Sequence, residues 1–347
     1  MTIATDSTPD HGSIKPFVFH GSGKEYFGIW IVNILLTILT LGIYSAWAKV
    51  RNKRYFNGNT ELDGHRFDYH ARPVQILIGR LVVVAFLFVL NLLQTILPFV
   101  ALFIVPLYLV LLPWVIVRGI RFNANMTSYR NVRFHFEGTK WGAFLAYILW
   151  PFAALLSLLT LTPFASRSNA RFLGNGYAYG TARFSADPPL GPFYKALGIG
   201  VVIVLAFVGL AFALALVFGA EPEMWMLSDP GLVAAPILIG LYYAYYTYAG
   251  YARNISYNAL ALEGGHTVRS TLHPRTYAWI VISNLFLIIV TLTLYTPWAK
   301  VRVARYLADH TTLFAASDLD DFVEGTIDRS GVASGEFLTL EGYDLGL

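Results

Sequence analysis

Two segments near opposite ends of the chain carry the same aromatic and basic side chains at the same spacing. Thr40 to Thr60 reads TLGIYSAWAKVRNKRYFNGNT and Thr291 to Thr311 reads TLTLYTPWAKVRVARYLADHT. Lys and Arg side chains just beyond a Tyr and Trp pair can reach lipid phosphates. The pattern therefore predicts a site for an anionic ligand or lipid headgroup, formed by Lys49, Arg51, Arg54, Lys300, Arg302 and Arg305.

The same residues also fit a simpler role. A membrane helix that ends in Trp, Lys and Arg is held at the headgroup level whatever the order of its basic residues. Anchoring does not require the repeated order, but a recent duplication would preserve that order without any shared function. The sequence leaves both interpretations open, lipid anchoring and a specific anion site.

Motifs for other kinds of chemistry are absent from the sequence. There is no G-x-x-x-x-G-K-[ST] phosphate loop and no H-E-x-x-H zinc motif. His65 and His70 form the only close histidine pair, and their spacing on a strand puts the rings on opposite faces, which suits a single metal ion poorly. The chain has no cysteine, which excludes thiolate metal sites and cysteine nucleophiles. We therefore expect no enzyme activity, no metal and no cofactor.

The composition indicates what kind of structure must position the basic residues. Only 13% of the residues are charged, whereas soluble domains have about 25%. The net charge is +4, but residues 317–347 hold eight acidic residues and one Arg, so the rest of the chain is strongly basic. In a membrane protein such an excess indicates cytoplasmic loops and not nucleic-acid binding. We expect the lipid bilayer, with its anionic lipids, as the main partner, and no nucleic acid.

Long apolar segments predict an all-α polytopic membrane protein, with short cytoplasmic strands between its helices. A bilayer-spanning helix needs about 20 apolar residues, and the run from Ala196 to Ala220 contains no charge. A membrane β-barrel would show weak alternating segments of about 10 residues instead. Seven apolar segments can be read, Phe27–Trp47, Val74–Pro98, Phe99–Val117, Trp141–Phe164, Ala196–Ala220, Gly231–Gly250 and Tyr277–Trp298.

The charges of the connections conflict with seven ordinary spans. Most connections are basic, which predicts a cytoplasmic location for them and for both termini. Seven full spans would nevertheless place the two basic connections around segment four on opposite sides. One solution is that segments one, four and seven enter the membrane and return, at breaks near Thr40–Gly42, Thr160–Pro163 and Thr291–Pro297. The alternative is seven full spans with one basic connection outside.

Internal similarity predicts duplicated units. Each unit has an apolar helix, a basic helical exit, a turn and a short strand, and the predicted strands include HRFDY, VRFHF and ARFSA at 65–69, 132–136 and 182–186. Weaker strands are expected at 16–23 and 268–272. We predict a flexible N-terminus over 1–15 and a membrane domain over 16–316, with units at 16–136, 132–272 and 273–316. An acidic cytoplasmic tail over 317–347 would offer a docking segment for a protein partner.

A few polar side chains fall within the apolar segments. Asn33 and Asn284 occupy matching places in segments one and seven, Asn91 and Gln94 lie one turn apart in segment two, and Arg80 lies near the inner end of that segment. Amides at such depth commonly form hydrogen bonds between helices, worth about 0.6 to 2 kcal/mol each. We interpret them as structural, with substrate contact as the alternative, and expect Arg80 to extend toward the membrane surface.

The residues from Phe17 to Arg80 carry a family resemblance. The run EYFGIWIVNILLTILTLGIYSAWAKVRNKRYFNGNT, followed by HRFDYHARPVQILIGR, resembles the YjgN-like family of bacterial inner-membrane proteins. The resemblance returns over Tyr277–Tyr306, although Ala308-Asp309-His310 there replaces Asn57-Gly58-Asn59. It implies a multi-pass protein of the bacterial inner membrane. It implies no activity, because the family's function is uncharacterised and it supplies no catalytic residues to carry over.

Three functional hypotheses follow from the sequence. The first is a membrane protein that binds or transports a small solute or lipid, in which Asn33, Asn284 and the helix breaks would converge on a cavity. The second is a membrane scaffold whose strands and tail recruit a partner, which would have a solid core at those positions. The third, a lipid-modifying enzyme, lacks a catalytic constellation. The oligomeric state is left open.

Overall fold

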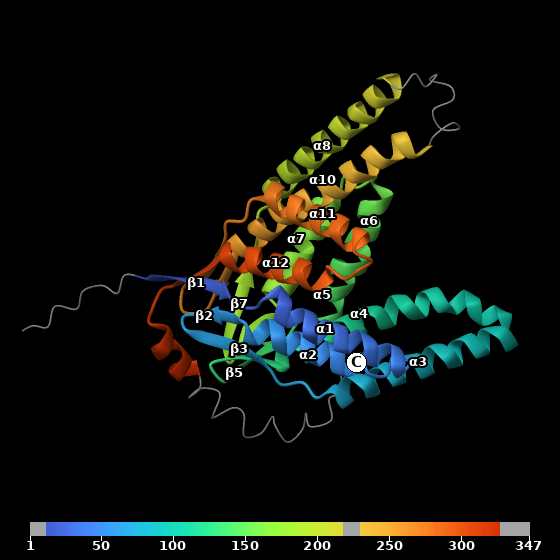
Figure 1. Ribbon diagram of the computed structural model, residues 1–347. Helices are drawn as coiled ribbons and strands as arrows, with labels where there is room; N and C mark the ends of the chain where they lie inside the picture. The colour runs from blue at the N-terminus through green and yellow to red at the C-terminus, as the bar shows by residue number, and fades with distance from the viewer. Residues whose placement is uncertain (1–11, 218–229, 327–347) are drawn as a thin grey trace, which may run out of the picture.

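Ten short strands form a closed antiparallel barrel at one end of the molecule (Figure 1). The structure, a computed structural model, describes residues 12–217 and 230–326. The order around the barrel is β1-β10-β9-β8-β7-β6-β5-β4-β3-β2, and Ser13 of β1 lies opposite Ala315 of β10 where the ring closes. The strands are β1 Ser13–Phe19, β2 Thr60–Leu62, β3 His65–Tyr69, β4 Thr127–Tyr129, β5 Val132–Phe136, β6 Tyr177–Tyr179, β7 Ala182–Ala186, β8 Leu260–Leu262, β9 His266–Ser270 and β10 Thr311–Ala315.

The barrel corrects the predicted all-α fold class. The five predicted strands correspond to β1, β3, β5, β7 and β9, but five further strands pair with them and close the ring. Four of these are only three residues long, such as TEL and TSY, and so short a segment carries no recognisable alternation. Among the described residues, three helices and not about seven are long and apolar enough to cross a membrane.

The helices form five hairpins, each held at its base by two paired strands. The central residue of the longer strand faces the last residue of the shorter one, as Phe67 faces Tyr129 and Phe134 faces Tyr179. We call the helix that leaves the barrel outgoing and the one that comes back the return helix. The hairpins are α1 Gly23–Leu39 with α2 Ser45–Gly58, α3 Pro73–Ile96 with η1 Pro98–Val100 and α4 Ala101–Asn125, α5 Lys140–Phe144 with η2 Leu145–Leu149, α6 Trp150–Leu156 and α7 Thr162–Gly174, α8 Leu190–Val217 with α10 Pro230–Asn258, and α11 Pro274–Val290 with α12 Thr296–Asp309.

Three of the hairpins are short, and they contain the predicted segments one, four and seven. Each segment includes the outgoing helix, a reversal and the start of the return helix, so none is a single straight helix. Because β1 pairs with β2, β5 with β6 and β9 with β10, the chain must come back to the barrel after each reversal. This is the geometry that the alternative of entering and returning requires.

The reversals use two successive residues in the left-handed region. They are Leu41 and Gly42, Leu158 and Leu159, and Leu292 and Thr293. The second reversal therefore lies just before the predicted Thr160–Pro163, and Pro163 belongs to the first turn of α7. The first leucine of each pair is 95%, 89% and 83% exposed, so all three tips present apolar side chains away from the protein core.

One hydroxyl at each tip serves both helices of the hairpin. Thr40 donates from Oγ1 to the carbonyl of Leu36 at 2.7 Å and accepts from the backbone N–H of Tyr44 at 2.9 Å. Ser157 and Thr291 make the equivalent pairs of bonds at the other two tips. Helix ends carry backbone groups without intrahelical partners. The hydroxyl satisfies one such group on each helix where little water is available.

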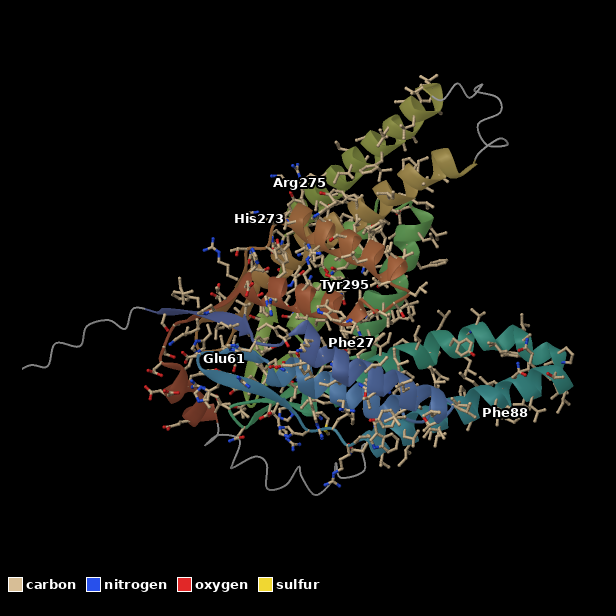
Figure 2. All side chains as sticks on the ribbon, in the orientation of Figure 1. Phe27, Glu61, Phe88, His273, Arg275 and Tyr295 are labelled. Carbon is tan, nitrogen blue, oxygen red and sulfur yellow. The ribbon has the colours of Figure 1, made fainter. Side chains whose placement is uncertain are left out.

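The two long hairpins carry the candidate membrane spans. These are Pro73–Ile96, Pro98–Asn125 and Leu190–Val217, while Lys140–Leu156 and Pro274–Val290 are shorter apolar helices. Figure 1 shows α3 with α4, and α8 with α10, extending well beyond the short hairpins. Phe88 on α3 lies far from the barrel and is exposed, like the other large apolar side chains around it (Figure 2). Such a surface requires a lipid environment or a partner.

A helix at residues 319–326 packs into the barrel, within the region predicted as an acidic tail. Leu319 and Val323 are buried in the barrel core, and Phe322 packs against them. Asp320 forms an ion pair with Arg130, which also bonds Asp63 at 3.1 Å. The predicted boundary at residue 15 falls inside β1. Residues 1–11, the acidic connection at 218–229 and the tail over 327–347 lie outside the described residues.

Replacing Thr291 by Val should destabilise the protein, because a methyl group then replaces the hydroxyl that forms two hydrogen bonds at the tip of α11 and α12. We expect a loss of about 1 to 2 kcal/mol, seen as a lower midpoint of thermal unfolding in detergent micelles. Thr291→Ser keeps the hydroxyl and should stay within about 0.5 kcal/mol of the parent. Equal effects of the two substitutions would contradict the double cap.

Candidate ligand-binding chamber

The return helices α2, α4, α7, α10 and α12 surround a central space next to the barrel. Each return helix packs against the outgoing helix of the next hairpin, α2 on α3, α4 on α5, α7 on α8, α10 on α11 and α12 on α1. The hairpins therefore form a closed ring, like the strands beneath them. Residues from all five return helices line the cavities within this ring.

The central space consists of cavities that share wall residues, and we call it the chamber. The largest has a volume of about 780 Å³ and is lined by residues of α2, α4, α7 and α10. A cavity of about 550 Å³ lies between α2 and Lys300 of α12, and one of about 490 Å³ lies along α11 and α12. Lys53 belongs to the walls of the first two, and Phe56 and Lys300 to those of the last two.

Four cationic side chains line the chamber, Lys49, Lys53, Arg253 and Lys300. No Asp or Glu is among the described residues that line these cavities. Arg253 donates to the hydroxyls of Ser270 and Thr311 and lies over the Tyr257 ring at 4.1 Å. Lys53 lies over Tyr69 and Lys300 over Tyr26. Their contacts are therefore with neutral groups, which leaves the chamber positively charged.

Burial lowers the pKa of Lys49, Lys53 and Lys300, and the neighbouring cations Arg80 and Lys53 contribute to the shift at Lys49. These lysines lie on α2 and α12, which are not among the candidate spans. Lys49 is partly buried, whereas Lys53 and Lys300 are exposed to water, because they face open cavities. A lowered lysine pKa means that the charged form is poorly solvated here. An anion in the chamber would compensate for that lost hydration.

Two of the predicted ligand residues support the backbone instead. Arg54 donates to the carbonyls of Tyr69 and Ala71, at 3.2 and 3.1 Å, and both of these residues are buried. Arg305 donates to the carbonyl of Gly21 at 3.0 Å. Arg121 and Asn254 make equivalent bonds to the carbonyls of Phe136 and Leu272. In each case the return helix is tied to the chain at or just after the end of the strand that leads into an outgoing helix.

The remaining predicted basic residues differ in their surroundings. Lys49 and Lys300 line the chamber, as described above. Arg302 donates to Ser283 and Asn284, at 2.9 and 3.2 Å, within the α11 and α12 hairpin. Arg51 is exposed. The repeated W-A-K-V-R-x-x-R-Y pattern therefore combines one chamber-facing lysine with one arginine that braces the backbone.

The predicted polar residues hold the short hairpins together. Asn33 is buried and donates to Asn52 at 3.1 Å, and Asn284 is buried and donates to the carbonyl of Ala299 at 3.2 Å. Each bond joins the outgoing helix to its return helix. Asn91 and Gln94 are exposed on α3. Arg80 donates to Ser45 at the start of α2.

The expected convergence of Asn33, Asn284 and the helix breaks on one cavity is wrong for the breaks. Leu41, Leu158 and Leu292 are exposed at the hairpin tips, so the reversals lie away from the chamber. Of the two asparagines, Asn284 lines a described cavity. His65 and His70, the histidine pair whose spacing suits a metal ion poorly, have different partners. His65 bonds the carbonyl of Asp63, and His70 bonds Ser128.

Lys53 and Arg253 were missed as site residues. Both are seven positions before the strand that follows their helix, at Thr60 and Leu260, so they occupy equivalent places on α2 and α10. In the sequence they look like ordinary basic residues of the connections between apolar segments. Counting back from the short strands would have found the equivalence, but these strands are themselves too short to recognise from sequence.

The fold and the chamber together define a membrane protein in which apolar helical hairpins stand on a closed strand ring. The chain belongs to the family described as bacterial protein of unknown function, DUF898, whose model matches residues 14–339. This result agrees with the predicted resemblance to YjgN-like proteins.

Relatives named inner membrane protein YjgN occur in enteric bacteria. The relative from Escherichia coli strain K12 is 42% identical over 138 residues, and that from Escherichia coli O157:H7 is 41% identical over 138 residues. These alignments cover 38% of this chain, which spans only 35% of each relative. The relative from Salmonella typhimurium is 27% identical over 353 residues, covering 87% of this chain and 89% of its own length. No solved structure matches the chain.

Replacing Arg54 by Gln should destabilise the fold, because two buried carbonyls lose a charged donor. We expect a loss of about 1 to 3 kcal/mol, measured as a lower midpoint of thermal unfolding in micelles. Arg51→Gln removes the same charge from the same helix at an exposed position and should change stability by no more than about 0.5 kcal/mol. If the two variants unfold alike, the brace contributes nothing.

Proposed function

We propose that this inner-membrane protein binds an anionic ligand in the chamber. The observation that supports the proposal is the set of four cations that face a common space without a carboxylate among the described lining residues. Partly desolvated charges in folded proteins are normally paired or otherwise compensated. Lys53 and Lys300 lie over aromatic rings, and Lys49 lies near the cations Arg80 and Lys53, so a bound anion is the partner that their environment lacks.

The walls of the chamber suit a lipid-derived anion as well as a small solute. The cavity along α11 and α12 is lined mainly by apolar residues, with Lys300 as its charged group. The helices around the chamber carry the exposed apolar surface of a membrane protein. The chamber therefore offers a ligand both cationic and apolar walls.

Binding is favoured here over passage through the protein. The helix at 319–326 occupies the end of the barrel opposite the chamber, through Leu319, Phe322 and Val323. The described structure thus provides one chamber with a closed far end. Transport would require this helix to move, whereas binding requires no change. A purely structural role would leave the acid-free cationic lining without an explanation.

Removing three chamber lysines should strongly weaken anion binding. We expect the variant Lys49→Gln, Lys53→Gln, Lys300→Gln to bind radiolabelled palmitate, hexanoate or phosphate at least on the order of 100-fold more weakly than the parent, since the loss of only one or two charged hydrogen bonds, each worth about 1.5 to 3 kcal/mol, already corresponds to that factor. Equilibrium binding to purified protein in a neutral maltoside detergent measures this. The three probes separate lipid anions from soluble anions.

The matched control removes three exposed lysines at the starts of outgoing helices, Lys24, Lys140 and Lys195, also by Gln. This variant has the same net charge as the chamber variant and should bind like the parent. Equal binding by the parent and the chamber variant, for all three anions, would overturn the proposal.

Binding should also weaken as the pH rises. Only the protonated lysine attracts an anion, and burial lowers the pKa of Lys49, Lys53 and Lys300. Affinity should therefore be full below the lowered pKa values and fall before the pH reaches the ordinary lysine value of about 10.4. A titration of palmitate affinity against pH checks this, since the palmitate carboxylate stays ionised throughout. A decline only above the ordinary lysine value would contradict it.

A further inference from the structure

The barrel has an apolar interior whose central layer repeats the same residue type. Side chains on a strand alternate between the two faces, and here Phe67 packs in the barrel core while Arg66 and Asp68 are exposed. The residues at the matching register in the other strands that lead into outgoing helices line the same lumen. They are Phe17, Phe134, Phe184 and Val268, and Leu313 of β10 lies opposite Val268 in the same lining.

The lumen contains a cavity of about 480 Å³. Two of the tyrosine hydroxyls in its wall already have partners, since Tyr129 donates to the carbonyl of Leu62 at 2.8 Å and Tyr179 to that of Tyr129 at 3.0 Å. Water is a poor occupant of a space whose polar groups are satisfied within the wall. Protein interiors also contain few voids larger than a water molecule. The space therefore favours an apolar occupant.

The two ends of the lumen differ. At the far end, the helix at 319–326 closes it, with Phe322 packed against His266 at 4.3 Å between ring centroids. At the near end, the lumen and the chamber share Phe67, Phe134, Phe184, Arg253 and Tyr257 as wall residues. Arg253 thus lies at the opening, and Lys53 lies in the adjoining chamber wall. The space is cationic at its entrance and apolar inside.

We infer that the ligand is a single-chain anionic amphiphile whose acyl chain occupies the barrel lumen. This inference rests on the proposed function, because the same chamber cations bind its carboxylate or phosphate headgroup. A strand of five residues spans about 16 Å, so the lumen is a short bore with one closed end. A flexible unbranched chain fits such a bore, and its headgroup then remains beside Arg253 and Lys53.

Filling the bore tests the inference without altering a cation. Val268 is the smallest of the five central residues, so Val268→Trp should fill the lumen and weaken palmitate binding by about tenfold or more, because several methylene groups lose their apolar site. Hexanoate, whose short chain stays near the entrance, should bind within about twofold of the parent. Thr267→Trp is the matched control, since the neighbouring side chain faces outward and should leave palmitate binding unchanged.

Photo-crosslinking of the parent protein gives a second measurement that does not depend on a folded variant. Palmitate with a diazirine at the end of its chain should label strands of the lumen or residues 319–326. Labelling confined to the membrane-facing sides of α3, α4 and α8 would overturn the inference, as would unchanged palmitate binding by a folded Val268→Trp variant. In either case, weaker binding by the lysine variant would still support the proposed function. If the lysine variant and Val268→Trp both bind palmitate like the parent, the proposed function and this inference are both rejected.

Discussion

The hairpins of this protein begin and end on one closed ring of backbone hydrogen bonds. Pairing of β1 with β10 joins strands from the two ends of the described chain, and every other strand pairs on both sides. A closed barrel leaves no edge strand with unpaired N–H and C=O groups. Because two antiparallel strands flank each hairpin, helices of very different length all return to the same rim. Arg54, Arg121, Asn254 and Arg305 reinforce this rim by donating to carbonyls at or just after the ends of the strands.

The chamber follows from the same ring. Five return helices placed around a barrel cannot all meet at its axis, and the space between them faces the lumen. The side chains that point into this space are cationic on α2, α10 and α12, and amide or hydroxyl groups such as Asn123 and Asn169 on α4 and α7. Desolvation without a carboxylate partner is unfavourable for a cation. Placing charge in such surroundings is more typical of a binding site than of a packed core.

The short and long hairpins solve the problem of an apolar environment in different ways. The helices α3, α4 and α8 of the long hairpins reach the length of membrane spans, so the reversal between α3 and α4 can meet polar surroundings. The short hairpins reverse within reach of apolar surroundings, where backbone groups must be satisfied internally. Thr40, Ser157 and Thr291 meet that need by bonding both helices, while exposed leucines cover the tips.

The sequence by itself determined the membrane class, predicted strands that overlap β1, β3, β5, β7 and β9, and offered reversals in segments one, four and seven as one of two alternatives. These features depend on local properties, namely apolar length, alternation over five residues, and breaks between helices. Asn33 and Asn284, interpreted from the sequence as structural, form hydrogen bonds within their own hairpins.

Only the tertiary structure decided that the strands close into a barrel, and which basic residues face a cavity. Ser13 and Ala315 meet across nearly the whole chain, and the three-residue strands between them carry too little pattern to predict a partner. Arg54 and Lys53 are neighbours of the same type in sequence, yet one bonds the backbone and the other lines the chamber. Their difference depends on the direction of each side chain relative to strands and helices distant in sequence, which local spacing does not encode.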